Sequence, residues 1–147
     1  MLTCKTITVG ELLTDAAHLF AEHAAEAGYA DGINPDTQKM LDICTAGGSI
    51  AIGLYKKHSI VGYSLTFLFP SLFDKHVIFA QNAGIFVEKS HRSGGAGLAL
   101  IRETEAQAKA RGAAVILFSS PVQSALCDIL PRRGYSSTEI LYRKPLG

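Results

Sequence analysis

The sequence predicts an α/β (α+β) fold whose helices and strands follow one another in the order βααβββαβαβ. Two observations lead to this prediction. The spacing of apolar residues changes repeatedly between two residues, typical of strands, and about 3.6 residues, typical of helices. Glycines, prolines or short polar runs stand at most of the points where the spacing changes. No repeat, low-complexity tract or linker interrupts the pattern, so we expect residues 1–147 to form a single domain.

The first third of the chain is expected to form one strand and two helices. Residues 4–9 (CKTITV) alternate in polarity as a strand does. Residues 11–28 place apolar side chains, together with His23 or Ala24, on one helical face, and Gly28 ends the helix. Asp36 is the expected N-cap of a second helix, which runs to the glycine pair that follows Ala46.

The middle of the chain is expected to form three consecutive strands. They cover residues 49–55, 59–69 and 76–87, and the short polar segments KKHS and PSLFD separate them. Strands joined by such short turns pair with opposite directions. The sequence therefore predicts an antiparallel meander.

The last third returns to a helical spacing. A helix is expected over residues 95–112, followed by a buried strand over 113–119 and a short helix over 122–133. The segment STEILYRKP, residues 137–145, is expected to form the last strand.

Composition excludes several classes of protein. The chain has 48% hydrophobic and 18% charged residues with a formal net charge of +1, which is unlike a disordered segment and provides no electrostatic footprint for nucleic acid. The longest apolar runs are shorter than a membrane span, and the N-terminus has no signal-peptide pattern, so we expect a cytoplasmic protein with no membrane partner. Cys4, Cys44 and Cys127 lie far apart without histidines at metal-ligand spacing, so we expect no metal.

The segment FVEKSHRSGGAGLALIRETEAQAKARGA contains three glycines between the end of a strand and the start of a helix. The first backbone N–H groups of a helix have no internal partner, and the helix dipole favours an anion there. Gly94, Gly95 and Gly97 would let a phosphate approach the main chain, and Arg92 would add a charge-assisted contact. The residues alone leave open whether this segment binds phosphate or is only a turn. The loops of nucleoside triphosphatases and of dinucleotide-binding proteins have other spacings.

A resemblance to a known family favours the phosphate site. Residues 92–97 (RSGGAG) match the signature of the GNAT superfamily of acetyl-coenzyme A dependent N-acetyltransferases, which is arginine or glutamine, two residues, glycine, one residue, then glycine or alanine. Leu100, Ile101 and Gly112 resemble the following helix of that family, and residues 130–146 look like its closing helix, glycine–aromatic turn and last strand. The chain is particularly similar to small acetyltransferases of phages and mobile elements.

This resemblance implies a GNAT fold with a mixed central sheet of about six to seven strands and helices on both faces. It implies acetyl-coenzyme A as cosubstrate, with the pantetheine arm in a gap that opens after a bulge in the fourth strand. Gly84 is the expected bulge position, although a glycine tolerated by packing remains an alternative. The residues expected to bind the cofactor are Ile85, Phe86, Val87, Arg92, Ser93, Gly94, Gly95, Ala96, Gly97, Leu98 and Gln123.

The catalytic residues usual in the family are not found by alignment. Gln81 and Asn82 occupy the region of the usual glutamate; they cannot accept a proton, but they could position water or the amine, or satisfy the splayed sheet. Leu130 stands where the family often has a tyrosine acid.

His91 and Tyr142 are the leading titratable candidates. Tyr63 could also reach a substrate cleft from its strand, although a tyrosine on a sheet is usually a packing residue, and His76 and Glu88 flank the fourth strand.

Three hypotheses follow from these residues. The first is an N-acetyltransferase in which a primary amine of a small molecule or protein attacks acetyl-coenzyme A directly. The second is a catalytically weak acyl-coenzyme A binding or interaction protein, and the third is an unrelated phosphate-binding α/β protein. The acceptor is expected near the segment GYADGIN, where Asp31 would attract a cationic amine. The sequence leaves open the identity of that amine and whether the chain forms a homodimer.

Overall fold

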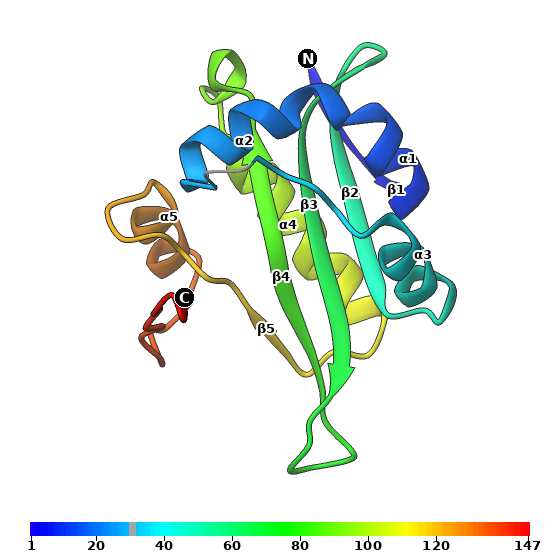
Figure 1. Ribbon diagram of the computed structural model, residues 1–147, viewed down its shortest axis with the longest axis vertical. Coiled ribbons are helices and arrows are strands. Elements are labelled where there is room, and N and C mark those ends of the chain that lie inside the picture. The colour runs from blue at the N-terminus through cyan, green and yellow to red at the C-terminus, as the bar shows by residue number, and fades with distance from the viewer. Residues whose placement is uncertain (30–31) are drawn as a thin grey trace.

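A five-stranded sheet in the order β1-β2-β3-β4-β5 forms the centre of the molecule (Figure 1). The structure is a computed structural model that describes residues 1–29 and 32–147. Strands β1 to β4 are antiparallel to their neighbours, whereas β5 runs parallel to β4. The strands are β1 Leu2–Ile7, β2 Ser49–Lys56, β3 Ser59–Pro70, β4 Ile78–Val87 and β5 Val115–Leu117. The predicted meander and mixed sheet are confirmed, but the predicted count of six to seven strands is too high.

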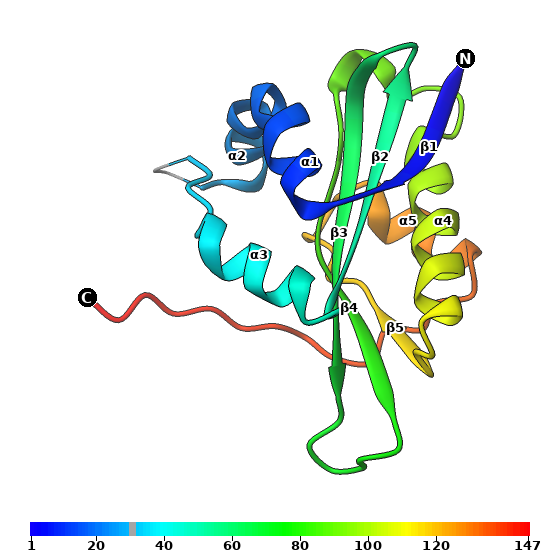
Figure 2. The ribbon, with the colours of Figure 1, turned by 90° about the vertical axis from the view of Figure 1, so that its right-hand side faces the viewer.

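Helices cover both faces of this sheet, as predicted (Figure 2). Helices α1, α2 and α3 lie on one face, and α4 and α5 lie on the other. The helices are α1 Val9–Asp15, the 3-10 turn η1 Ala17–Leu19, α2 Phe20–Ala27, α3 Thr37–Thr45, the 3-10 turn η2 Lys89–His91, α4 Ala96–Ala110 and α5 Leu126–Arg132. None of the helices in residues 1–29 and 32–147 is both long and apolar enough to cross a membrane.

The single helix predicted over residues 11–28 is wrong, because η1 divides it into α1 and α2. Helix α1 starts earlier than predicted because Thr8 and Glu11 form a reciprocal capping box, with bonds of 3.0 and 3.1 Å between backbone N–H groups and side-chain oxygens. The break changes the direction of the chain, so that α1 packs on β2 while α2 reaches β4. A straight helix would not follow the twisted sheet in this way.

The core has two layers, one on each face of the sheet. Between the sheet and α1 to α3, the buried side chains include Val9, Leu12, Ala16, Leu19, Tyr55, Tyr63, Leu65 and Phe86. Between the sheet and α4, they include Ile50, Ile52, Leu54, Val61, Ala80, Val87, Leu100 and Ala108. Burial of these two apolar surfaces holds the sheet rigid and fixes the positions of β4 and α4.

The strand predicted over residues 137–145 does not form, and that prediction is wrong. This segment has no regular structure, and Ile140, Leu141 and Tyr142 are 77%, 87% and 85% exposed. Alternating polarity produces a strand only where a neighbouring edge offers hydrogen bonds, and β5 is only three residues long. The segment instead runs along the outside of the fold and ends away from the sheet (Figure 2).

Candidate functional site

A bulge divides β4 into two parts. Leu65 of β3 pairs with Gly84, and the next residue, Thr66, pairs with Asn82, so Ala83 is the extra residue on β4. The bulge therefore lies directly before Gly84, where the sequence suggested one. It also exchanges the faces of the strand: Ala80 packs toward α4 before the bulge, and Phe86 packs toward α2 after it.

Strands β4 and β5 separate just before this bulge. They pair only where Phe79–Gln81 meets Val115–Leu117. Beyond Gln81, no described residue forms a strand against this edge of β4, and a pocket occupies the space between β4, α2 and α5. Six residues that the sequence assigned to cofactor binding line this pocket, namely Ile85, Phe86, Val87, Arg92, Gly97 and Gln123.

The glycine-rich loop leads from this pocket into α4. Gly94 and Gly95 have φ angles of 79° and 81°, a left-handed conformation that favours glycine, and Gly95 is the N-cap of α4. No side chain caps the helix. A Cβ atom added at Gly94, Gly95 or Gly97 would meet no atom within 4 Å, so the first amides of α4 border open space that an anionic group could enter.

The other predicted loop residues contribute mainly through their main chain. Ser93 is exposed, Leu98 is half-buried, and the side chain of Ala96 is buried against the core. The exposed amides and buried Ala96 together fit the requirements of a diphosphate cradle: the backbone is accessible, and the helix start is anchored.

Arg92 connects this loop to two other elements. Its Nε donates a 2.8 Å hydrogen bond to the carbonyl oxygen of Val87, and its guanidinium forms an ion pair with Glu26 of α2. The guanidinium also lies 5.4 Å from the ring centre of Phe86. The sequence assigned Arg92 to a phosphate contact; in the structure, its charge already has a carboxylate partner.

The neighbouring amides Gln81 and Asn82 lie in different environments. Asn82 is buried, and its Nδ2 lies 3.0 Å from Ser64 Oγ, 3.1 Å from the Leu65 carbonyl oxygen and 3.2 Å from Thr66 Oγ1. Ser64 in turn bonds to Thr104 of α4, so this network crosses the core on the α4 side. Gln81 is exposed at the last residue paired with β5.

Leu130 occupies the position of the expected catalytic acid, and it carries no hydroxyl group. This side chain is 7% exposed and belongs to the core. Tyr135, which follows in the closing turn, bonds through its hydroxyl to Glu105 of α4 at 2.9 Å and packs its ring edge-to-face on Phe118. These contacts anchor the end of α5 to α4.

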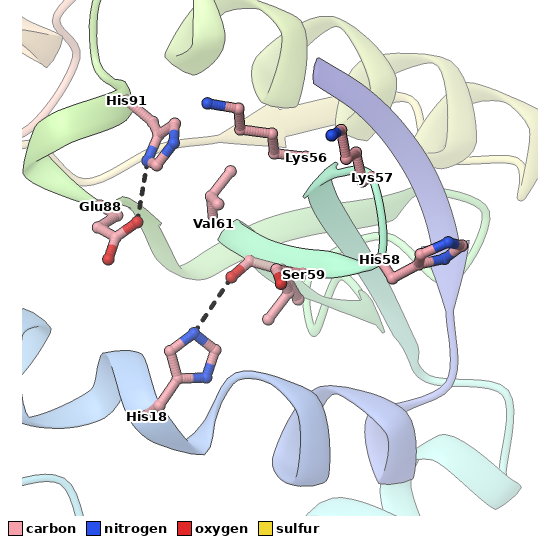
Figure 3. Close-up of a pocket in the computed structure, with 9 residues that line it drawn as sticks. His18, Lys56, Lys57, His58, Ser59, Val61, Glu88 and His91 are labelled. Atoms are coloured by element: carbon pink, nitrogen blue, oxygen red, sulfur yellow. Dashed lines mark hydrogen bonds and ion pairs between the residues drawn. The ribbon is translucent and has the colours of Figure 1, made fainter. Parts of the chain in front are cut away.

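The two leading titratable candidates from the sequence, Tyr142 and His91, lie outside the pocket between β4 and α5. Tyr142 is exposed in the C-terminal segment. His91 lines a second hollow, beside the turn between β2 and β3, where its Nδ1 lies 2.9 Å from Glu88 Oε2 (Figure 3). Lys56 and Lys57 line the same hollow. Asp31, expected near the acceptor, lies outside the described residues.

Among the pocket residues that sequence reasoning missed is His23 of α2, which it placed only among the packing residues of a helix. Its ring stacks on Phe86 with 4.9 Å between the centroids and 18° between the planes. Its Nδ1 hydrogen-bonds the hydroxyl of Tyr63 on β3. Burial lowers the pKa of His23, with nearby Glu26 raising it and Arg92 lowering it. The one signal in the sequence was a histidine on an otherwise apolar helical face.

The mixed sheet, the bulged and separated fourth strand, and the glycine-rich start of α4 define an acyltransferase of the type that the sequence resembles. Residues 14–135 match the family described as Acetyltransferase (GNAT) family. The chain belongs to this family and is an enzyme of the acyltransferase class. No curated protein gives a significant sequence match.

Solved structures of acetyltransferases share this fold across their full length. An aminoglycoside acetyltransferase from an uncultured soil metagenomic sample has a TM-score of 0.80 at 19% identity, covering 100% of this chain and 99% of that one. Ribosomal-protein-alanine N-acetyltransferase from Brucella melitensis has a TM-score of 0.70 at 19% identity, covering 100% of both chains. Glucosamine-6-phosphate N-acetyltransferase from Arabidopsis thaliana has a TM-score of 0.77 at 10% identity, covering 100% and 99%. At these identities the likeness establishes the fold alone.

Proposed function

We propose that this enzyme is an N-acetyltransferase that transfers the acetyl group of acetyl-coenzyme A to a primary amine of a small molecule or protein by direct attack. The observation that carries the proposal is the free edge of β4 beyond Gln81, which borders a pocket and leads into the uncapped start of α4. An extended amide-containing arm can pair with such an edge, and a diphosphate can bind at such a helix start.

The residues present fit this cosubstrate. The amides of residues 93–97 would bind the diphosphate, with Leu98 in the first covered turn of the helix. The main chain of residues 85–87 would pair with the pantetheine arm, and Gln123 would contact it from the opposite side of the pocket. Arg92 would hold the loop against β4 and α2 through its bonds to Val87 and Glu26.

The chemistry requires a neutral amine, stabilisation of the oxyanion that forms on the thioester carbonyl, and a proton for the departing thiolate. Main-chain N–H groups at the free edge of β4 are suited to the oxyanion. Gln81, exposed where β5 leaves the sheet, would orient water or the amine. We assign Asn82 an indirect positioning role, because its amide supports the bulge from the α4 side.

The proposed acceptor class rests on the substrates named for similar structures. The similar structures named above are described as acting on an aminoglycoside, on alanine of a ribosomal protein and on glucosamine 6-phosphate, each of which carries a primary amine. We therefore propose a primary amine as the acceptor, and we place it on the α2 side of β4 because the pocket beside the free edge opens there.

Two measurements test this function together. Acetyl-coenzyme A and coenzyme A should each raise the melting temperature, because a ligand that binds only the folded state adds about 2.7 kcal/mol at a hundred times its dissociation constant. Release of the free thiol should then be measured over polyamines, aminoglycosides, amino acids and peptide N-termini. No thermal shift with either ligand at millimolar concentration would remove the proposal.

A thermal shift without thiol release for any amine would instead favour the catalytically weak acyl-coenzyme A binding protein. The observation behind this alternative is Leu130, which is buried in the core where related enzymes often carry a tyrosine acid.

A further inference from the structure

We propose that His23 is the catalytic base of this enzyme, accepting the proton of the attacking amine at Nε2, and that Tyr63 positions its ring. The inference rests on the proposed acetyl transfer and assigns the proton acceptor that Gln81 and Asn82 cannot supply. It depends on where the imidazole lies, how it is held and which nitrogen remains available.

The imidazole lies beside the part of β4 where the thioester would bind. His23 lines the pocket together with Ile85, Phe86 and Val87. A Cβ atom added at Gly84 would lie 3.6 Å from His23 Cε1, an ordinary contact distance, so the imidazole ring lies close to the bulged main chain. A group bound along the free edge of β4 would therefore meet this ring.

Contacts from two strands fix the orientation of the ring. One face of the imidazole stacks on Phe86, and Nδ1 hydrogen-bonds the Tyr63 hydroxyl. Tyr63 is itself 5% exposed, and Phe20 packs edge-to-face on its ring at 5.8 Å between centroids. A base held this way loses little conformational freedom when substrate binds.

The tautomer of the ring decides which nitrogen can act. Burial raises the pKa of Tyr63, so its phenol stays protonated and can either donate to Nδ1 or accept from it; we assign the tautomer in which Nδ1–H donates to the Tyr63 oxygen. This tautomer leaves the lone pair on Nε2, which has no hydrogen-bond partner among residues 1–29 and 32–147. Because burial lowers the pKa of His23, the ring is neutral near pH 7.

The titratable and charged groups that face His23 come from α2, the segment that follows it, the glycine-rich loop and β3. Glu26 of the same helix raises the pKa of His23 and Arg92 of the loop lowers it, and these two side chains form an ion pair with each other. Tyr63 lies on β3, and the ring of Tyr29 is 6.5 Å away.

The other four histidines do not share this environment. His18 Nε2 lies 3.2 Å from the carbonyl oxygen of Ile60, and His91 pairs with Glu88 (Figure 3). His58 and His76 are exposed. Only His23 among the five histidines lines the pocket beside the free edge of β4.

The proton balance of the reaction is complete with this one base. The amine nitrogen forms a bond to the acetyl carbon, and Nε2 takes the proton that this nitrogen must lose. The carbon–sulfur bond then breaks, and the proton on Nε2 passes to the departing thiolate. Amine and thioester become amide and thiol, without any further reactant.

The test compares His23→Gln with the wild type, using an acceptor whose amine is neutral across the whole pH range. Glutamine has a polar amide but cannot accept a proton. We expect kcat/KM to fall about a hundredfold near pH 7.5, within the usual range for loss of a general base. The wild-type profile should decline below the pKa of His23, whereas the variant profile should be flat. The matched control is His76→Gln, since His76 is exposed and bonds only through its backbone N–H.

Tyr63→Phe tests the positioning role, because it keeps the ring and removes the hydroxyl. Without an acceptor for Nδ1–H the imidazolium is less stable, so we expect kcat/KM to fall about tenfold and the acid limb to move to lower pH.

The outcomes separate this inference from the proposed function. Thiol release by the wild type, together with an unchanged pH profile in His23→Gln, would overturn the role of His23 and leave the acetyltransferase intact. Loss of stabilisation by coenzyme A in His23→Gln would mean that His23 serves binding or folding, which also overturns the inference. Absence of thiol release by the wild type with every amine would overturn both.

Discussion

The two halves of β4 differ at the edge that faces away from β3: one half pairs with β5, and the other borders the pocket. Residues 78–82 are held by β3 on one side, and three of them are also held by β5 on the other. Residues 84–87 pair with β3 only, and their other edge borders the pocket. One extra residue, Ala83, separates the halves. A single bulge thus turns a structural strand into the wall of a site.

The same bulge explains why adjacent polar residues have different environments. Asn82 faces the core beneath α4, where its Nδ2 lies within hydrogen-bond distance of two hydroxyl oxygens and a carbonyl oxygen. Two residues later, Gly84 faces His23 of α2. If this division is correct, changes in the first half should alter stability, and changes around the second half should alter binding and rate.

The largest expected effect is on cofactor affinity, from Gly95→Asp. A carboxylate about 4 Å from a phosphate costs roughly 4 kcal/mol at the effective dielectric of a protein surface, so we expect at least about a hundredfold weaker binding of coenzyme A by calorimetry. Stability should fall by roughly 1 kcal/mol, because the φ of 81° favours glycine, although aspartate tolerates it better than most residues.

Gly95→Asn is the matched control, because it has the same shape and backbone tolerance without the charge. Its affinity should fall much less than that of the aspartate variant. Equal affinities for the wild type and the aspartate variant would mean that the loop is only a turn.

Asn82→Ala should produce the next largest effect, and it should be on stability. The change leaves buried oxygens of Ser64, Leu65 and Thr66 without this donor, so the free energy of unfolding should fall by about 2 kcal/mol. Urea denaturation measures it.

Gln81→Ala provides the opposite case at the neighbouring position. Because the Gln81 side chain is exposed, the free energy of unfolding of the variant should stay within about 0.5 kcal/mol of wild type. Its kcat/KM should fall roughly ten- to a hundredfold. Similar losses of stability in the Asn82 and Gln81 variants would contradict the division of β4.

A smaller effect is expected on the pH dependence of stability. Because the pKa of His23 is lowered in the folded state, the unfolded chain takes up the proton first as the pH falls below the usual value of about 6.5. The wild type should therefore lose stability between pH 7.5 and the folded pKa, relative to His23→Gln. Equal losses in the two proteins, measured by urea denaturation at several pH values, would show that His23 is not held neutral by the fold.

The smallest effect should follow deletion of residues 137–147. Their apolar side chains are exposed and pair with no described strand, so the free energy of unfolding should change by less than about 0.5 kcal/mol. A clear drop in melting temperature would show that this segment covers the edge of β5 in solution.

Features that depend on neighbouring residues along the chain could be predicted. Asp36 caps α3 through a 3.0 Å bond to the backbone N–H of Lys39, and the glycines before α4 adopt the left-handed conformation that only glycine readily takes. The meander and the helix after the glycine loop also follow from local periodicity. The separation of β4 from β5 is predicted from the family resemblance, because the six-residue signature at 92–97 identifies β4 as the preceding strand and α4 as the following helix.

Features that depend on distant partners required the tertiary structure. Periodicity could not show that η1 divides the first helix, or that residues 137–145 lack a partner, because twist and pairing are properties of the whole sheet. The pairing of His23 with Tyr63, forty positions apart in sequence, likewise appears only when α2 crosses β3 and β4.

The family, the order of most elements and the glycine-rich start of α4 can be read from the amino-acid sequence, since each depends on residue types at short, fixed spacings. The folded chain alone shows which of Gln81 and Asn82 is exposed and which histidine lies in the pocket. One unpaired residue at Ala83 changes the face of every later residue of β4, and only the register with β3 reveals where that residue lies.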